Sequence, residues 1–206
     1  MKKIVIEENG YVIADIPKNV FDELIESIDY KQIADKKKFN DHLAGNIENE
    51  LDVTGLIPNS FYEYMANLAN NFYASFPIGL NLPQEKSFDF FATWLNVQKK
   101  YEFNPNHSHA GDLSYVVWLQ IPYDLEEELS LPNCINSFIR RNSVFSFTTN
   151  DIDHPIWVDK SYVGKVILFK STLRHAVYPF YTSNDERISL SGNITTKWSK
   201  PKFAVA

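Results

Sequence analysis

The sequence predicts an α+β fold in which two helices precede a β-rich barrel or sandwich. Two amphipathic segments lie before residue 77, and short apolar runs separated by turn residues begin at residue 88. The aromatic share of 15% is typical of a β-rich interior. Because the helices and strands occupy separate parts of the chain, we expect the helices to pack on one face of a sheet.

The first 28 residues predict a hairpin and a helix. Lys3–Glu7 and Tyr11–Asp15 read as strands, with a turn signal at Glu8-Asn9-Gly10 between them. Asn19 is the expected N-cap of the helix that follows. Apolar side chains on one face of this helix recur at helical spacing: Phe21, Leu24, Ile25 and Ile28.

A second helix is expected after a polar, irregular stretch over residues 31–58. Asn59 or Ser60 can cap its start, and Pro77 ends it. Its apolar positions again share one face: Phe61, Met65, Leu68, Phe72 and Phe76.

The rest of the chain predicts an antiparallel β-structure within a single domain over residues 1–206. We divide it into N-terminal strands and supporting helices (1–87), a β-barrel core (88–194) and a loosely held tail (195–206). The expected strands are Phe88–Val97, Leu113–Ile121, Ser143–Thr148, Pro155–Val158, Lys165–Phe169, His175–Tyr178 and Arg187–Ile194.

Composition and charge narrow the class of protein. The net charge of −6 disfavours non-specific attraction to nucleic acid or anionic membrane. No stretch approaches the length of about 18 apolar residues that suggests a membrane span. The start of the chain lacks the apolar core of a secretion signal, and the one cysteine, Cys134, has no internal disulfide partner. A reducing, cytoplasmic setting is therefore expected.

Two histidines lie together in the stretch Asn104-Pro-Asn-His-Ser-His-Ala-Gly-Asp112, directly before an apolar strand. Because side chains alternate along extended backbone, His107 and His109 are expected on the same side. Two imidazoles there can bind one cation, although the pair alone leaves the metal open among iron, zinc, copper and nickel. The alternative is that both histidines only form hydrogen bonds in a polar loop.

A third histidine and an arginine occur further along the chain. His175 opens one predicted strand and Arg187 opens the next, so we expect them on paired strands. Arg187 and Ser189 share one face of their strand. If that face is buried, the guanidinium needs an anion, and its planar fork suits a carboxylate. Alternatively, Arg187 is exposed and pairs with Asp185 or Glu186.

Together these stretches resemble the 2-oxoglutarate/Fe(II)-dependent dioxygenase superfamily, especially small phage-type oxygenases related to the prolyl-hydroxylase branch. The resemblance covers Trp94 to Ile194. It includes Trp94-Leu-Asn96, the run from Asn104 to Pro122, Gly164 to His175, and Glu186-Arg-Ile-Ser-Leu-Ser-Gly-Asn193. In that family a His-x-Asp or His-x-Glu pair and a later histidine hold iron, and an arginine, often in Arg-x-Ser, binds the far carboxylate of 2-oxoglutarate.

The resemblance implies a double-stranded β-helix, a jelly-roll or cupin-like barrel, with the N-terminal helices packed on one sheet. It implies an enzyme that uses Fe(II), 2-oxoglutarate and O2 to hydroxylate a small-molecule or peptide substrate, with decarboxylation of 2-oxoglutarate to succinate. His107 and His175 take the place of iron ligands, and Arg187 and Ser189 that of the carboxylate site. No further catalytic residue is implied beyond the metal ligands.

The second ligand departs from the family pattern, because His109 stands where the family has a carboxylate. A three-histidine site keeps the His-x-ligand spacing, and we favour it. A second solution pairs His109 with Asp112, which alternatively accepts a ring N–H of a ligating histidine. In a third, His109-Ala-Gly111 resembles the His-x-Gly variant of the family, in which no side chain fills the third position.

Other positions carry less specific expectations. His42 and His154 are expected at the surface. The acidic segment Tyr123–Asn136 is a candidate loop at the mouth of the barrel, or simply a solvated loop. Five aromatic strand residues are expected to pack in the core: Tyr115, Trp118, Phe145, Phe147 and Trp157.

Two other functions compete with this interpretation. One is a non-catalytic cupin-like protein that binds a metal or small ligand, or serves as a structural module. A structural module needs none of the three histidines or the arginine. The other is a three-histidine dioxygenase that does not use 2-oxoglutarate, in which Arg187 would have no co-substrate to bind.

Overall fold

Two β-sheets and two longer helices make up most of the structure. The computed structural model describes residues 1–6, 9–28, 39, 45–76, 86–136, 138 and 140–198. The strands are β1 (Lys2–Ile6), β2 (Asn9–Asp15), β3 (Asn49–Asp52), β4 (Lys86–Gln98), β5 (Asn104–His107), β6 (Leu113–Gln120), β7 (Val144–Thr149), β8 (Ile152–Trp157), β9 (Lys165–Lys170), β10 (Arg174–Val177) and β11 (Arg187–Trp198). The helices are α1 (Lys18–Ser27), α3 (Asn59–Ser75), α4 (Leu125–Ser130), α5 (Pro132–Ile135) and the 3-10 turn η2 (Lys160–Tyr162).

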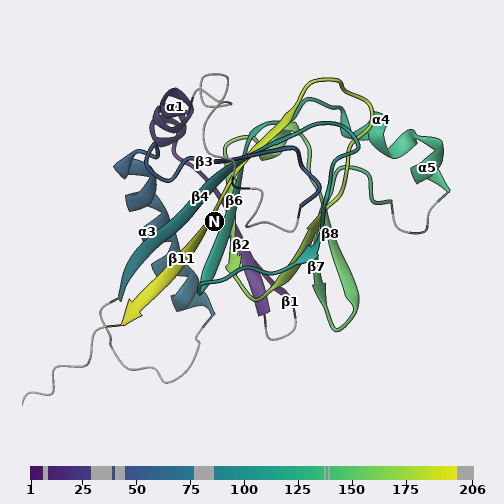
Figure 1. The fold of residues 1–206 in the computed structure, drawn as a ribbon. Helices are drawn as coiled ribbons and strands as arrows, with labels where there is room; N and C mark the ends of the chain where they lie inside the picture. Colours follow the sequence, from purple (N-terminus) through teal and green to yellow (C-terminus); the bar gives the residue numbers. More distant parts are fainter. Residues whose placement is uncertain are drawn as a thin grey trace, which may run out of the picture.

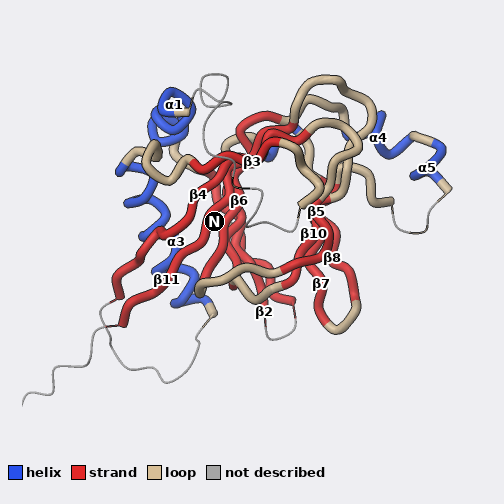
Figure 2. The backbone as a smooth tube through the Cα atoms, viewed as in Figure 1, coloured by secondary structure: helices blue, strands red, loops and turns tan. Residues whose placement is uncertain are grey.

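The strands form a seven-stranded sheet in the order β1-β2-β9-β6-β11-β4-β3 and a four-stranded sheet in the order β5-β10-β7-β8 (Figure 2). All pairings between these neighbours are antiparallel. The sequence-based expectation that His175 and Arg187 lie on paired strands is wrong, because β10 pairs with β5 and β7 while β11 pairs with β4 and β6. The two residues instead come from different sheets.

The helices, the large sheet and the small sheet form three layers, with α1 and α3 on the side of the large sheet away from β7 and β8 (Figure 1). Alternation along the strands separates two apolar clusters. Val117 and Leu168 pack with the helices, whereas Val116 and Ile167 pack between the sheets. The prediction that the N-terminal helices cover one face of a sheet is confirmed. No helix in the described parts of the chain has the length and apolar character to cross a membrane.

The predicted hairpin is present, with pairing that runs from Lys2↔Ile13 to Ile6↔Asn9. Asn9 and Gly10 belong to β2 rather than to the turn, and Glu8 lies outside the described residues. A side chain at Gly10 would collide with the Ile4 carbonyl and the Phe76 ring. Glycine therefore allows the hairpin to lie close to the end of α3.

Both predicted helices exist, but their caps differ from the prediction. Helix α1 begins at Lys18, so Asn19 lies inside it, and Pro17 occupies the N-cap without a side-chain hydrogen bond. Pro58 occupies the same position before α3, while the Ser60 hydroxyl donates to Glu23 at 2.6 Å instead of capping. Proline fixes φ near the value that a helix start needs, which explains both starts.

Several strand predictions need correction. Strands β3 and β5 were not predicted, and Thr195–Trp198, expected as part of a loose tail, continues β11 in pairing with β4. Residues 199–206 of that tail lie outside the described residues. Of the five predicted core aromatics four are buried, but Trp157 is 41% exposed because it faces outward from the edge strand β8.

Candidate active site

Two of the candidate metal ligands face each other across a strand pair. His107 ends β5 and stands opposite His175 on β10 in antiparallel register. His109 follows in the segment before β6, where its backbone N–H donates to the Ser171 carbonyl at 2.9 Å. One ring nitrogen of each of His107, His109 and His175 lies within 4.8 Å of the others. The structure therefore brings together the three histidines that the sequence suggested.

Backbone carbonyls orient two of these rings. Nδ1 of His107 lies 2.6 Å from the Pro105 carbonyl, and Nδ1 of His175 lies 3.0 Å from the Leu173 carbonyl. Since a carbonyl only accepts hydrogen bonds, each Nδ1 carries a proton and each Nε2 keeps its lone pair. This arrangement fixes the tautomer in which Nε2 can bind a metal.

Burial keeps the three rings neutral. It lowers the pKa of His175 well below its usual value of 6.5, with a further contribution from His107 and His109. Burial, together with His107, lowers the pKa of His109 to about 4, and burial also lowers the pKa of His107. Because metals bind neutral imidazole, the histidines do not have to lose protons at pH 7 before they bind a cation.

Asp112, the alternative carboxylate ligand, is not part of the histidine cluster. Its Oδ2 accepts a hydrogen bond from the backbone N–H of Thr196 at 2.6 Å. Its backbone N–H donates to Ile194, and its carbonyl accepts from Ser171. Asp112 therefore connects the start of β6 to β11, and the ring N–H groups that it was expected to accept go to backbone carbonyls instead.

Arg187 is the second charged feature of the site and is only 2% exposed. Its Nε and Nη2 donate to Gln98 Oε1 at 3.0 and 2.7 Å, and Nη2 also donates to the Tyr178 carbonyl at 2.8 Å. Nη1 donates to the Tyr123 hydroxyl at 3.1 Å and to the Ser143 carbonyl at 3.4 Å. All these acceptors are neutral, and the alternative of an ion pair with Asp185 or Glu186 is wrong. Among the described residues no carboxylate balances this buried cation.

One pocket between the two sheets contains both features. On β4, Trp94 lies at the histidine end, with its ring 5.3 Å from His109, and Gln98 lies at the arginine end. Four residues of strand separate these two positions by about 13 Å along the backbone. None of the described residues that line the pocket is acidic, so it suits an elongated anion.

The middle of this pocket is partly polar. Asn96 Nδ2 donates to the hydroxyls of Ser191 at 3.1 Å and Ser189 at 3.3 Å. Arg187, Ser189 and Ser191 all line the pocket, which confirms the predicted shared face of their strand. The Ser189 hydroxyl therefore lies on the expected wall, where it contacts Asn96.

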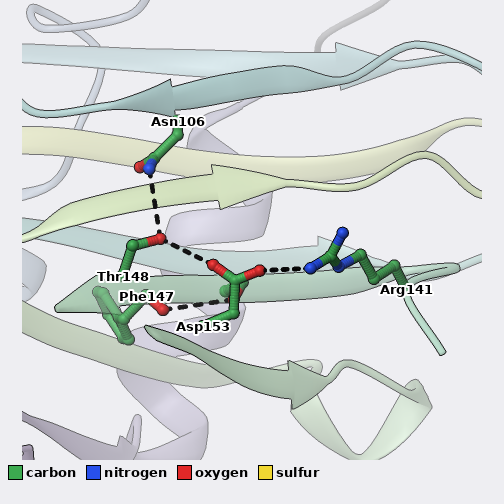
Figure 3. Close-up of polar contacts among 6 residues, drawn as sticks. Asn106, Arg141, Phe147, Thr148 and Asp153 are labelled. Carbon is green, nitrogen blue, oxygen red and sulfur yellow. Dashed lines mark hydrogen bonds and ion pairs between the residues drawn. The ribbon is translucent and has the colours of Figure 1, made fainter. Parts of the chain in front are cut away.

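A polar network on the small sheet connects the edge strand β5 to its neighbours (Figure 3). Asn106, directly before His107, donates to Thr148 on β7 at 3.3 Å, and Thr148 donates to Asp153 on β8 at 3.1 Å. Arg141 forms an ion pair with Asp153 at 2.7 Å. These contacts hold in place the strand that carries His107, the first candidate metal ligand.

Of the two remaining histidines only His154 lies among the described residues, and it is not part of this cluster. His154 is half-buried on β8, and its Nε2 lies 2.9 Å from the Thr149 hydroxyl, so the expectation of a surface residue is only partly met. His42 lies outside the described residues.

Comparison with known proteins identifies the family. The family model described as "Putative 2OG-Fe(II) oxygenase" matches residues 92–193, which include all three histidines and Arg187. The chain belongs to the 2-oxoglutarate/Fe(II) oxygenase superfamily. No curated protein sequence matches it.

Solved structures of this superfamily share the fold. A Pseudomonas putida prolyl-4-hydroxylase has a TM-score of 0.54 at 14% identity, covering 92% of this chain and 91% of that one. A Trichoplax adhaerens prolyl hydroxylase, in complex with a hypoxia inducible factor peptide fragment, has a TM-score of 0.54 at 10% identity, covering 92% and 83%. A Burkholderia pseudomallei 2OG-Fe(II) oxygenase family protein has a TM-score of 0.50 at 17% identity, covering 90% and 84%. The two-sheet architecture is consistent with a jelly roll.

As a 2-oxoglutarate/Fe(II) oxygenase, the chain uses Fe(II) and 2-oxoglutarate, and its residues fit both. Neutral imidazoles bind Fe(II), and the three histidines offer three nitrogens toward one point. The five N–H groups of Arg187 all donate to neutral acceptors, so a carboxylate would replace some of these hydrogen bonds but would not have to displace another anion.

The sequence did not indicate the residues that surround Arg187. Gln98 lies two positions beyond Asn96 on the same face of β4, so strand alternation could have suggested it. Tyr123 lies in the acidic segment that was interpreted as a mouth loop, and no local pattern points from it to Arg187.

Proposed function

We propose that the chain is a dioxygenase that hydroxylates its substrate and converts 2-oxoglutarate to succinate, and that its barrel is a double-stranded β-helix. The observation that carries the proposal is the pocket itself, with three neutral histidines at one end and, at the other, a buried arginine that has no counter-ion in the described parts of the chain. Either feature alone has a structural explanation. Their occurrence in one pocket matches a ligand with a chelating end and a distal carboxylate.

In this proposal His107, His109 and His175 hold the iron, and Arg187 grips the distal carboxylate of 2-oxoglutarate. The hydrogen bond between Asp112 and Thr196 supports His109 over Asp112 as the remaining ligand. When bound, Fe(II) would supply the chemistry with O2, at coordination positions that no side chain of the protein fills. The protein's own contribution is to orient the rings, bind the co-substrate and keep the pocket dry through its apolar wall of Val116, Phe145 and Phe169.

The substrate we propose is a small molecule or a peptide. The T. adhaerens prolyl hydroxylase of similar fold was solved with a peptide, which makes a peptide one candidate class. The net charge of −6 argues against nucleic acid as the substrate.

The deciding experiment is an anaerobic titration of the Fe(II)-loaded protein with 2-oxoglutarate. Chelation by the keto acid should produce a metal-to-ligand charge-transfer band that gives the dissociation constant. Arg187→Lys keeps the charge but loses the two-pronged geometry, so it should raise this constant by about ten- to hundredfold. Metal affinity should stay the same, and Arg140→Lys, at an exposed position, should match wild type.

Two results would contradict the proposal in different ways. If the wild-type protein shows neither the charge-transfer band nor affinity for 2-oxoglutarate, then 2-oxoglutarate is not its co-substrate. Equal affinities in wild type and Arg187→Lys would place the carboxylate anchor at another residue.

A further inference from the structure

The loop between β10 and β11 forms part of the surroundings of Arg187. Its Tyr178 carbonyl accepts from Nη2 at 2.8 Å, and the Phe180 ring lies 5.6 Å from the guanidinium carbon. These two contacts restrict the plane in which the guanidinium lies. The position of the loop therefore influences the direction in which Arg187 presents its donors.

Glu128 on α4 holds this loop. Its Oε1 accepts three hydrogen bonds, from the backbone N–H of Tyr181 at 2.8 Å and from the N–H and hydroxyl of Thr182 at 2.6 and 2.7 Å. Hydrogen bonds to a carboxylate are stronger than those between neutral groups. Glu128 is 0% exposed, whereas Glu126 and Glu127 in the same acidic run are exposed. The run is therefore not simply a solvated loop, because one of its acids is an internal anchor.

Helix α4 contacts the surroundings of Arg187 at a second point. Tyr123, next to the N-cap residue Asp124, places its hydroxyl 3.1 Å from Nη1 of Arg187 and its ring 5.2 Å from that of Phe180. The chain thus contacts the arginine through Tyr123, just before this short helix, and anchors the loop through Glu128 within the helix.

A neutral side chain could also hold the loop at this position. Oε2 of Glu128 is buried and has no hydrogen-bond partner among the described residues, which is unfavourable. A glutamine could offer the same three donors an oxygen without burying a charge. A carboxylate forms stronger hydrogen bonds to this loop than an amide would. The same loop carries the Tyr178 carbonyl, which accepts a hydrogen bond from the buried Arg187 guanidinium.

We propose that Glu128 is a positioning residue for the co-substrate site. It fixes the loop from Tyr178 to Thr182 so that the Arg187 fork is oriented before the carboxylate arrives, which reduces the ordering that binding requires. The inference rests on the proposed role of Arg187 in binding 2-oxoglutarate. Glu128 does not touch the ligand in this account and acts through the loop.

The first test compares Glu128→Ala, Glu128→Gln and the exposed control Glu127→Gln in the anaerobic titration. Glu128→Ala should raise the 2-oxoglutarate dissociation constant by about tenfold or more, with Mn²⁺ affinity within about twofold of wild type. Glu128→Gln keeps an acceptor oxygen and should recover most of the loss. Glu127→Gln should be indistinguishable from wild type.

The second test needs no co-substrate. Solvent exchange of the Arg187 Nε–H, which donates to Gln98, can be followed by NMR in the metal-free protein, with the resonance assigned through Arg187→Lys. Glu128→Ala should accelerate this exchange if the loop orients the guanidinium. Faster exchange in Glu128→Ala, combined with a wild type that does not bind 2-oxoglutarate, would show that Glu128 orients Arg187 but would overturn the proposed function and with it the role in the co-substrate site.

The opposite pattern would overturn the positioning role alone. In this pattern wild type binds 2-oxoglutarate, and Glu128→Ala has the same affinity for 2-oxoglutarate and the same exchange rate of the Arg187 Nε–H as wild type. If Glu128→Ala does not fold, Thr182→Val takes its place in both measurements. This variant removes one of the three hydrogen bonds to Glu128 by a change at an exposed residue. A several-fold loss of affinity with faster exchange in Thr182→Val supports the inference, and no change in either overturns it.

Discussion

The three histidines are prepared for metal binding by their surroundings rather than by neighbouring acids. Backbone carbonyls hold Nδ1 of His107 and His175, and burial lowers the pKa of all three rings. A site of neutral ligands leaves the full charge of a divalent cation to be balanced by what else binds. A dianionic co-substrate fits that requirement.

The identity of the third ligand can be tested by two substitutions. Because His109 belongs to the cluster and Asp112 does not, His109→Ala should weaken Mn²⁺ binding by at least about tenfold. Asp112→Asn retains an oxygen that can accept from Thr196 and should change affinity by less than about twofold. Calorimetric titration of the metal-free proteins measures both constants.

His154→Ala is the matched control for histidine removal, since His154 contacts Thr149 outside the cluster. Loss of binding in Asp112→Asn with normal binding in His109→Ala would reverse the assignment. Loss in neither would favour a site completed by water instead of a third side chain.

The sequence singled out four residues that the structure brings into one pocket, but not the residues that surround them. His107, His109, His175 and Arg187 stand out because their types and order are unusual in an otherwise apolar β-rich segment. The contact of Arg187 with Gln98 spans 89 positions. Contacts of such separation follow from sheet order, which local periodicity does not encode.

The side of the sandwich where β3 and β5 lie contains a buried acid. Glu50 on β3 is 0% exposed, pairs in register with Asn96 and is hydrogen-bonded to the side chain of Asn104 on β5. Burial raises its pKa from 4.5 to about 7, the Asn104 hydrogen bond opposes this shift, and Glu102 adds to it. Glu50 thus connects the edge strands of the two sheets. Burial of its carboxylate lowers the stability of the folded protein by an amount that depends on pH.

The sign of this dependence follows from proton uptake. Between pH 4.5 and about 7 the folded protein binds more protons at Glu50 than the unfolded chain, so its contribution to stability falls as pH rises through this range. Glu50→Gln removes the effect. The free energy of unfolding of Glu50→Gln relative to wild type should therefore increase between pH 5 and 8, on the order of 1–3 kcal/mol.

Urea denaturation at several pH values measures this difference. The histidines titrate in both proteins, so the comparison isolates Glu50. Glu63→Gln, at an exposed position on α3, should give a curve parallel to wild type. A parallel curve for Glu50→Gln as well would mean that its carboxyl titrates normally in the folded protein.

The sequence predicted the helices and strands whose apolar periodicity is strong. It missed strands that are extended only because a neighbouring strand pairs with them. The Asn-Pro-Asn-His sequence of β5 has no β-propensity pattern, and it is extended because β10 pairs with it. The assignment of β10 and β11 to one sheet was wrong because a hairpin-like spacing does not show that the chain crosses between sheets.

In the whole molecule, the candidate site joins the two sheets. Arg187 and Gln98 belong to the seven-stranded sheet, and His107 and His175 belong to the four-stranded one. A ligand that contacts both ends of the pocket therefore links the two layers. Neither sheet can unfold without losing that ligand, so binding should stabilise the molecule as a unit.

Thermal unfolding with ligands tests this coupling. Mn²⁺ at about 100 times its dissociation constant adds about 2.7 kcal/mol. For a chain of this size, that corresponds to a rise in Tm of about 5–10 °C. Adding 2-oxoglutarate should raise Tm further in wild type, and Arg187→Lys should keep the metal increment but lose most of the second one. Glutarate, which lacks the keto group and cannot chelate the metal through it, should give a smaller second increment than 2-oxoglutarate.

The coupling also predicts that spectroscopic signals from different layers of the molecule shift together on ligand binding. Tryptophan fluorescence reports residues on the strands, including Trp94 and Trp118 in the pocket, and far-UV circular dichroism includes α1 and α3 on the outer face. If the ligand links both layers, the two transitions should shift by the same amount and stay coincident. A shift seen only in the tryptophan fluorescence would mean that the ligand stabilises the region between the sheets without the helical layer. Equal increments from 2-oxoglutarate in wild type and Arg187→Lys would show that the link to the seven-stranded sheet does not run through the arginine.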